Sequence, residues 1–267
     1  LDFNFGGMTV RDGSIPGFSA NVFAASISGA SVFLGSGARL NYDKNGIITT
    51  VDDSDGANDL TEDAIGFLAT NASLGLNILQ VAFEGEIGAL YVGASATVAD
   101  ASLVGVSDVS LSIGGTVRGN FTTASDGVRL DWATASIVND SVDQLFDLEI
   151  SSNLQLDGEG TAAVNIADFV VGSADFDFSS QTVDIDTDGD GAISIADPQL
   201  DLKDALLMTF SLSNLQLFVG AGAASGDVDD VIGFELTEGQ LGLVVATANP
   251  ATLGQNNRSY LAVTASL

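Results

Sequence analysis

The residues of this chain best suited to chemistry are the carboxylates of one acidic run, residues 186–197. Asp186, Asp188 and Asp190 occupy its first, third and fifth positions, and Gly191 follows at the sixth. Calcium-binding loops have this spacing, in which the aspartates supply oxygen ligands and the glycine allows a sharp turn. The run therefore predicts a site for a hard divalent cation.

The remaining ligands follow from the same spacing. Ala192 would supply its backbone carbonyl, Ser194 its hydroxyl, directly or through water, and Asp197 a closing carboxylate. Aspartate is shorter than the glutamate usual at this closing position, so we expect a weaker or differently shaped site. The predicted Ca²⁺ ligands are Asp186, Asp188, Asp190, Ala192, Ser194 and Asp197. The alternative is an acidic turn without an ion, in which aspartate and glycine serve only as turn formers.

Such a loop needs a regular element on each side to position it. Residues 176–185 alternate apolar and polar side chains, which predicts a strand before the loop. Residues 197–208 predict a helix after it, because Pro198 suits a first helical turn and leucines recur at helical spacing. A second helix is expected over residues 59–67. The loop would then join a strand to a helix.

Elsewhere the pattern is that of β-strands. Apolar and polar residues alternate in short runs, with Gly, Ser, Asn and Asp between them as turn formers. About ten units, each with two apolar-x-apolar groups around small or polar residues, recur at about 20–25 residues, a spacing found in solenoids. We predict an all-β, elongated, repetitive, β-solenoid-like architecture with few short helices. The alternative is a tandem β-sandwich.

A longer repeat divides the chain. The matching segments are residues 1–5 and 174–178, 23–35 and 208–220, 65–76 and 232–243, and 90–95 and 260–265. Their separation gives a period of about 170 residues. We therefore predict a first copy over residues 1–173 and a partial second copy over residues 174–267.

Composition limits the classes of function. The chain has 36 acidic and 7 basic residues, a formal net charge of −29. Nucleic acids and anionic membrane surfaces would be repelled, whereas divalent cations would be attracted. No apolar stretch reaches the length of about 18 residues that a membrane-spanning helix needs. Histidine and cysteine are absent, which removes the usual nucleophile–base pairs and thiolate metal sites.

Four short segments resemble the repeats of giant bacterial surface proteins, the LEPR-XLL-type and related adhesin-like chains. These segments are residues 101–106, 109–111, 209–220 and 260–266. The resemblance implies a secreted, acidic, calcium-dependent protein with an adhesive or structural role, and it supplies no catalytic residues. We accordingly expect an extracellular or cell-surface location.

Together these observations predict a non-catalytic extracellular module, stabilised by calcium, that serves structure or adhesion and could form a fibre or surface layer. Its expected partners are calcium, further copies or neighbouring repeats, and a glycan or cell-surface receptor, with no nucleic acid and no membrane insertion. The alternative is a carbohydrate-binding or polysaccharide-cleaving β-helix protein, in which acidic residues would act in pairs.

Overall fold

The computed structural model describes residues 1–11, 18–42, 48–52, 64–83, 86–138, 148–194, 201–222, 231–249 and 258–266. Every regular element within these residues is a β-strand, which confirms the all-β prediction. The strands are β1 (Asp2–Arg11), β2 (Phe18–Ser36), β3 (Arg39–Tyr42), β4 (Ile48–Asp52), β5 (Ile65–Phe83), β6 (Glu86–Val104), β7 (Val109–Thr122), β8 (Ser136–Val138), β9 (Leu154–Ile166), β10 (Val170–Ile185), β11 (Leu202–Ala221), β12 (Ile232–Thr247) and β13 (Ser259–Ser266).

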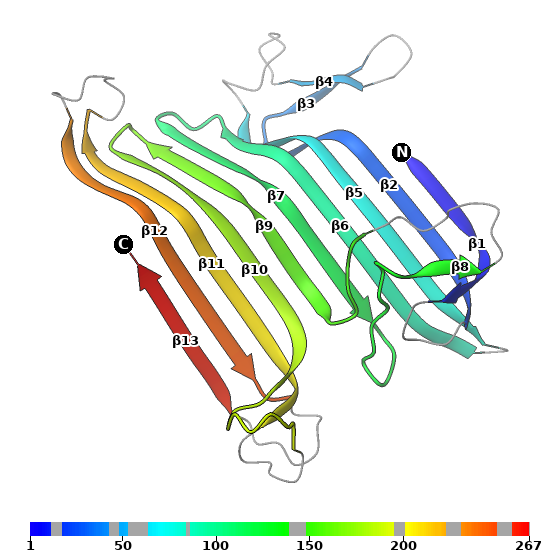
Figure 1. Cartoon of the computed structure of the whole chain (residues 1–267). Coiled ribbons are helices and arrows are strands. Elements are labelled where there is room, and N and C mark those ends of the chain that lie inside the picture. The colour runs from blue at the N-terminus through cyan, green and yellow to red at the C-terminus, as the bar shows by residue number, and fades with distance from the viewer. Residues whose placement is uncertain are drawn as a thin grey trace.

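Eleven strands form one open antiparallel sheet, in the order β13-β12-β11-β10-β9-β7-β6-β5-β2-β1-β8 (Figure 1). Strands β3 and β4 form a separate hairpin. Most neighbours in the large sheet are also neighbours in sequence, so an elongated, repetitive fold is confirmed. Its repeating unit is a long strand paired on both sides, and in the described residues no second large sheet is formed.

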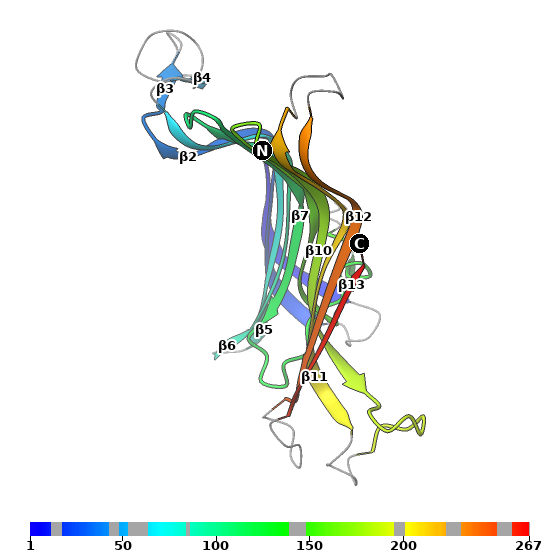
Figure 2. The ribbon, with the colours of Figure 1, turned by 90° about the vertical axis from the view of Figure 1, so that its left-hand side faces the viewer.

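The strands are unusually long, and this explains the short sequence units. Strand β11 has 20 residues, whereas strands in globular proteins usually have about five or six. Residues 210–217 and 234–243 are two of the units with paired apolar-x-apolar groups, and each lies within one continuous strand, β11 or β12. The small and polar residues between their apolar groups lie at breaks in the pairing register, which are β-bulges rather than chain reversals. Figure 2 shows the sheet from its side, with the strands bending towards one end.

The prediction of short helices is wrong for the described residues. From Leu202 onward, the segment predicted as a helix over residues 197–208 belongs to β11, and residues 65–67 of the other predicted helix begin β5. Tertiary pairing overrides the helical pattern here. Leu202 and Ala205 are buried against Ala246 of β12, and the backbone of β11 pairs with β10 and β12. None of the described residues forms a helix long and apolar enough to cross a membrane.

The two faces of the sheet differ in polarity. Residues directly opposite each other on paired strands point to the same face, so the register defines rows of side chains. One row crosses ten strands without a charged residue and consists of Phe3, Ala25, Leu76, Ala94, Gly119, Leu156, Ser180, Met208, Val245 and Leu261. The next row on the same face consists of Ile27, Leu74, Ala96, Val117, Gly158, Phe178, Phe210, Leu243 and Val263. We call the surface formed by these two rows the apolar face.

The main hydrophobic core lies on the opposite face, beneath the segment that follows β7. The cluster consists of Val10, Ala20, Val22, Leu79, Tyr91, Leu130, Trp132, Leu148 and Ile150. Buried Asn120 ties this segment to the sheet. Its Nδ2 donates to the Leu130 carbonyl at 2.9 Å, and its Oδ1 accepts from Trp132 Nε1 at 3.0 Å. The segment therefore gives the sheet a local second layer in which apolar side chains leave water.

Two strand pairs in different parts of the sheet have the same register, including its interruptions. In both β2–β5 and β11–β12 the pairing shifts twice, at corresponding positions. The corresponding pairs are Ile27–Leu74 and Leu212–Leu241, Ala30–Ala72 and Leu215–Gly239, Val32–Ala69 and Leu217–Leu236, and Gly35–Gly66 and Gly220–Gly233. Backbones with positive φ also correspond, in the residue pairs Gly29 and Asn214, Gly37 and Gly222, and Asn71 and Glu238. This likeness accompanies the longer sequence repeat, whose boundaries at residues 1–173 and 174–267 stay a prediction.

Replacing Ile150 by alanine should test the covering role of the segment after β7. Ile150 has no exposed surface, so Ile150→Ala should lower the free energy of unfolding by about 2–5 kcal/mol. Val128 is 45% exposed, and Val128→Ala should cost less than about 1 kcal/mol. Urea denaturation of both variants measures the difference. Equal losses would show that this segment does not cover a core.

Candidate metal site

The acidic loop predicted from the sequence connects β10 to β11, at one end of the sheet (Figure 1). Asp186 directly follows β10 and is partly buried, whereas Asp188 and Asp190 are exposed. One ligand oxygen from each of the three carboxylates lies within 4.8 Å of the others. Because β11 follows the loop, it joins two antiparallel strands, and the predicted strand–loop–helix arrangement is wrong.

Backbone N–H groups of the loop hold these carboxylates in place. The two oxygens of Asp186 accept hydrogen bonds from Gly189 N at 2.6 Å and Gly191 N at 2.8 Å. Asp188 Oδ1 accepts from Asp190 N at 3.1 Å, and Asp190 Oδ1 accepts from Ala192 N at 2.7 Å. Asp and Asn side chains stabilise tight turns in this way. The loop conformation and the clustering of the carboxylates thus have the same origin.

The two glycines of the loop are required by its backbone. Gly189 has φ of 78° and Gly191 has φ of 85°, in the region that side chains with a Cβ rarely adopt. A Cβ at either position would meet no other atom within 4 Å, so the requirement is conformational rather than one of space. The glycine at the sixth position therefore makes the turn that the sequence spacing predicted.

Asp201, which the sequence pattern did not indicate, closes the loop from its far side. Its side chain is buried, with 6% of the residue exposed. Oδ1 accepts from Thr187 N at 3.1 Å, and Oδ2 accepts from Ser194 N at 3.0 Å. This carboxylate therefore joins the beginning of the loop to its end. The residue was overlooked because it lay inside the predicted helix, where an acidic residue before Leu202 gave no sign of such a role.

Of the six predicted ligands, three are brought together, two lie in the same loop, and one is outside the described residues. Asp186, Asp188 and Asp190 are brought together. Ala192 and Ser194 lie in the same loop, and their backbone N–H groups are bound by Asp190 and Asp201 respectively. Asp197 lies outside the described residues, as do most of the acidic stretch at residues 52–63 and the turn at residues 227–230. The described part of the loop supplies three clustered carboxylates, which could hold a metal ion.

The loop environment shifts two carboxyl pKa values in opposite directions. Hydrogen bonds from Gly191 N and then Gly189 N lower the pKa of Asp186, since they stabilise its charged form. The bond from Asp190 N favours charged Asp188, but it is outweighed by desolvation, the charge of Asp190, a side-chain hydrogen bond with Asp186 and the charge of Asp201, which together raise the pKa of Asp188. A bound cation would relieve the repulsion that raises this pKa.

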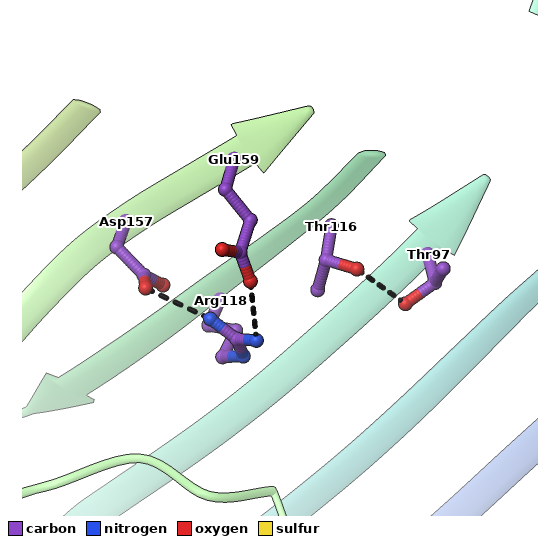
Figure 3. Close-up of polar contacts among 5 residues, drawn as sticks. All are labelled: Thr97, Thr116, Arg118, Asp157 and Glu159. Atoms are coloured by element: carbon purple, nitrogen blue, oxygen red, sulfur yellow. Dashed lines mark hydrogen bonds and ion pairs between the residues drawn. The ribbon is translucent and has the colours of Figure 1, made fainter. Parts of the chain in front are cut away.

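A second polar group lies on the sheet itself. Arg118 of β7 forms ion pairs with Asp157 and Glu159 of β9, both at 2.9 Å (Figure 3). Next to it, the hydroxyls of Thr97 and Thr116 are 2.9 Å apart. Burial is the largest influence on Asp157, and it raises the pKa of that carboxyl against the opposing effect of Arg118. These contacts join neighbouring strands across one face, so Arg118 acts within the sheet rather than beside the acidic loop.

Comparison with known proteins does not assign the chain to a family. No protein-family model matches the chain, and no curated protein or solved structure matches it. The resemblance to LEPR-XLL-type repeats therefore stays a prediction. The fold and the loop define an elongated all-β chain with a candidate metal site.

The closing role of Asp201 can be tested by Asp201→Asn. An amide would place N–H donors against one of the two backbone N–H groups and lose a charge-assisted bond, so the free energy of unfolding should fall by about 1–3 kcal/mol. Asp100 is exposed on β6, and Asp100→Asn should change the stability by no more than about 0.5 kcal/mol. Urea denaturation in the presence of a chelator measures both. Equal stabilities would contradict the role of Asp201.

The pKa shifts predict the order of titration in the metal-free loop. Asp186 should protonate at lower pH than Asp188, because its pKa is lowered and that of Asp188 is raised. The stabilisation from Asp186 should be fully present above its unfolded pKa of about 4 and be lost as the pH falls through its lower folded value. Carboxyl carbon chemical shifts followed by NMR measure both titrations. The reverse order would show that these hydrogen bonds do not form in solution.

Proposed function

We propose that this chain is a non-catalytic structural or adhesive module of a secreted or cell-surface protein, and that it binds calcium in the loop between β10 and β11. The observation that carries the proposal is the cluster of Asp186, Asp188 and Asp190, whose oxygens lie within 4.8 Å in a loop with calcium-type spacing. Three carboxylates so close together repel one another, and a divalent cation would offset this repulsion.

The mechanical part of the proposal is supported by the shape of the fold. Long strands paired on both sides make a continuous sheet, and ends of β10 and β11 meet at the acidic loop. Calcium would fix the connection between these strands and neutralise part of the net charge of −29. A turnover function has no support in the composition, since histidine and cysteine are absent. An extracellular location suits a weak site, because calcium is plentiful there.

Calcium binding can be tested at Asp188, where a change to asparagine removes a charge and keeps a contact with the loop backbone. The hydrogen bond that Asp188 Oδ1 accepts from Asp190 N would survive in Asp188→Asn, because the amide oxygen can still accept. For the unchanged chain we expect a Kd of about 0.1–1 mM, the range of extracellular modules. Asp188→Asn should weaken binding about tenfold or more, because ligand charge sets the affinity of such sites. Isothermal titration calorimetry measures both constants.

Asp100→Asn is the matched control, since it removes the same charge from an exposed strand position. It should leave the Kd unchanged within about twofold, given screening at physiological salt. Calcium should also raise the melting temperature of the unchanged chain, because it binds the folded loop. A melting temperature identical in calcium and in excess chelator would contradict the proposal.

A polar groove favours the second candidate, a carbohydrate-binding module. Its volume is about 670 Å³, and its polar lining includes Asp126, Arg129, Asn153, Gln155 and Thr182. Arg129 donates to Thr182 Oγ1 at 3.4 Å, and burial lowers its pKa. Amide, hydroxyl and guanidinium groups in one groove suit sugar hydroxyls. The single tryptophan, however, is only 3% exposed and cannot stack on a sugar from the core. Binding on a glycan array that Arg129→Ala abolishes would favour this candidate.

A further inference from the structure

The likeness between the two parts of the sheet allows the described partners of β1 and β13 to be compared with those of their counterparts. Two sets of four neighbouring strands correspond, in the same direction across the sheet: β1-β2-β5-β6 and β10-β11-β12-β13. In this correspondence β1 matches β10, and β6 matches β13. In the interior of the sheet, β6 has a second partner, β7, and β10 has a second partner, β9. Their counterparts at the edges are β13 and β1. In the described residues β13 pairs only with β12, and β1 has an outer partner, β8, only at residues 9–11.

The two open edges have complementary directions. All neighbours between β13 and β1 are antiparallel, and these two strands stand first and tenth in the order. They therefore run in opposite directions. A second copy placed beside the first without rotation would bring its β1 antiparallel to β13, with the apolar faces on the same side. The pairing pattern of the sheet would then continue from one copy to the next.

The side chains at these edges do not oppose such pairing. All eight residues of β13 are exposed, and none of them is charged, in a chain with 36 acidic residues. Natural edge strands are usually protected by charge, proline or a covering segment. Leu261 is 68% exposed and Phe3 is 61% exposed. These two residues are the ends of the row that crosses the apolar face, so pairing would join the row across copies.

We propose that the outer edge of β13 binds β1 of a second copy of this chain, antiparallel, so that copies add side by side into one growing sheet. This proposal rests on the structural role proposed above and identifies the binding partner as a second copy of the chain. Backbone hydrogen bonds would supply the attraction, as in other cases where a strand adds to a sheet edge. Because the contact is between two different edges, and the copies are related without rotation, it does not close into a ring and gives an open filament. The net charge opposes assembly, so salt or calcium should promote it.

The experiment introduces lysine at each edge of the full chain. Val263→Lys blocks the β13 edge at a residue that is 63% exposed, and Phe3→Lys blocks the β1 edge. Val117→Lys is the control: Val117 lies in the same row as Val263 but on interior β7, and it is 43% exposed. Sedimentation velocity and electron microscopy follow assembly at about 150 mM salt with calcium in excess of its Kd. Circular dichroism checks that each variant is folded.

The unchanged chain should form filaments that lengthen with concentration. Val263→Lys and Phe3→Lys should each weaken association about tenfold or more, whereas Val117→Lys should change it less than about threefold. A mixture of the two edge variants should form dimers that grow no further, since one intact β13 meets one intact β1. If Phe3→Lys unfolds, Gly7→Lys replaces it, because a Cβ at Gly7 meets only Asn21 Oδ1 at 3.7 Å.

Three results would overturn the proposal. A folded, unchanged chain that stays monomeric at all concentrations would do so. Phe3→Lys chains that dimerise as tightly as the unchanged chain associates would show that β13 pairs with itself. Equal losses from Val117→Lys would show association through the apolar face. Calcium-dependent melting is measured separately on the same samples, so a failure of edge pairing is distinguishable from a failure of the calcium site.

Discussion

Backbone hydrogen bonding between neighbouring strands is the interaction on which this structure depends. Eleven of the thirteen described strands form one large sheet, and among the described residues only the segment after β7 covers part of it with a substantial buried cluster. Many large apolar side chains remain exposed, including Leu34 and Ile232, each at 77%. With so little burial across layers, lateral pairing determines which residues are neighbours. It therefore also determines the rows of the apolar face, the bends of the strands and the state of the two edges.

In the acidic loop, repulsion between carboxylates opposes the close approach that the connection between β10 and β11 requires. β10 and β11 pair closely up to Ile185, after which Asp186, Asp188 and Asp190 gather in the connection. Backbone N–H groups and the buried Asp201 shape the loop, while the like charges of its aspartates oppose its compactness. A bound calcium ion would attract all three carboxylates and so turn this repulsion into a net attraction. The proposed function joins two observations: a sheet held by its backbone hydrogen bonds, and a turn in which three carboxylates gather.

The sequence predicted the class of fold and the centre of the site, for physical reasons that can be identified. Alternation with period two is a local property, so β-structure was visible in residues 176–185. The spacing of Asp186, Asp188 and Asp190 is also local, and it predicted their clustering. Asp201 was missed because its partners, Thr187 and Ser194, are fixed only when the loop closes. The strand beginning at Leu202 was mistaken for a helix because leucines at helical spacing also fit a paired strand with an irregular register.

Two glycine pairs can show whether lateral pairing imposes the same register on both parts of the sheet. Gly35 faces Gly66, and Gly220 faces Gly233. In both pairs a Cβ on the first glycine would lie 2.2 Å from a carbonyl oxygen, of Ile65 or Ile232, so only glycine allows this approach. NMR should show cross-strand contacts between the α-protons of both pairs. Contacts in one pair but not in the other would contradict a shared register.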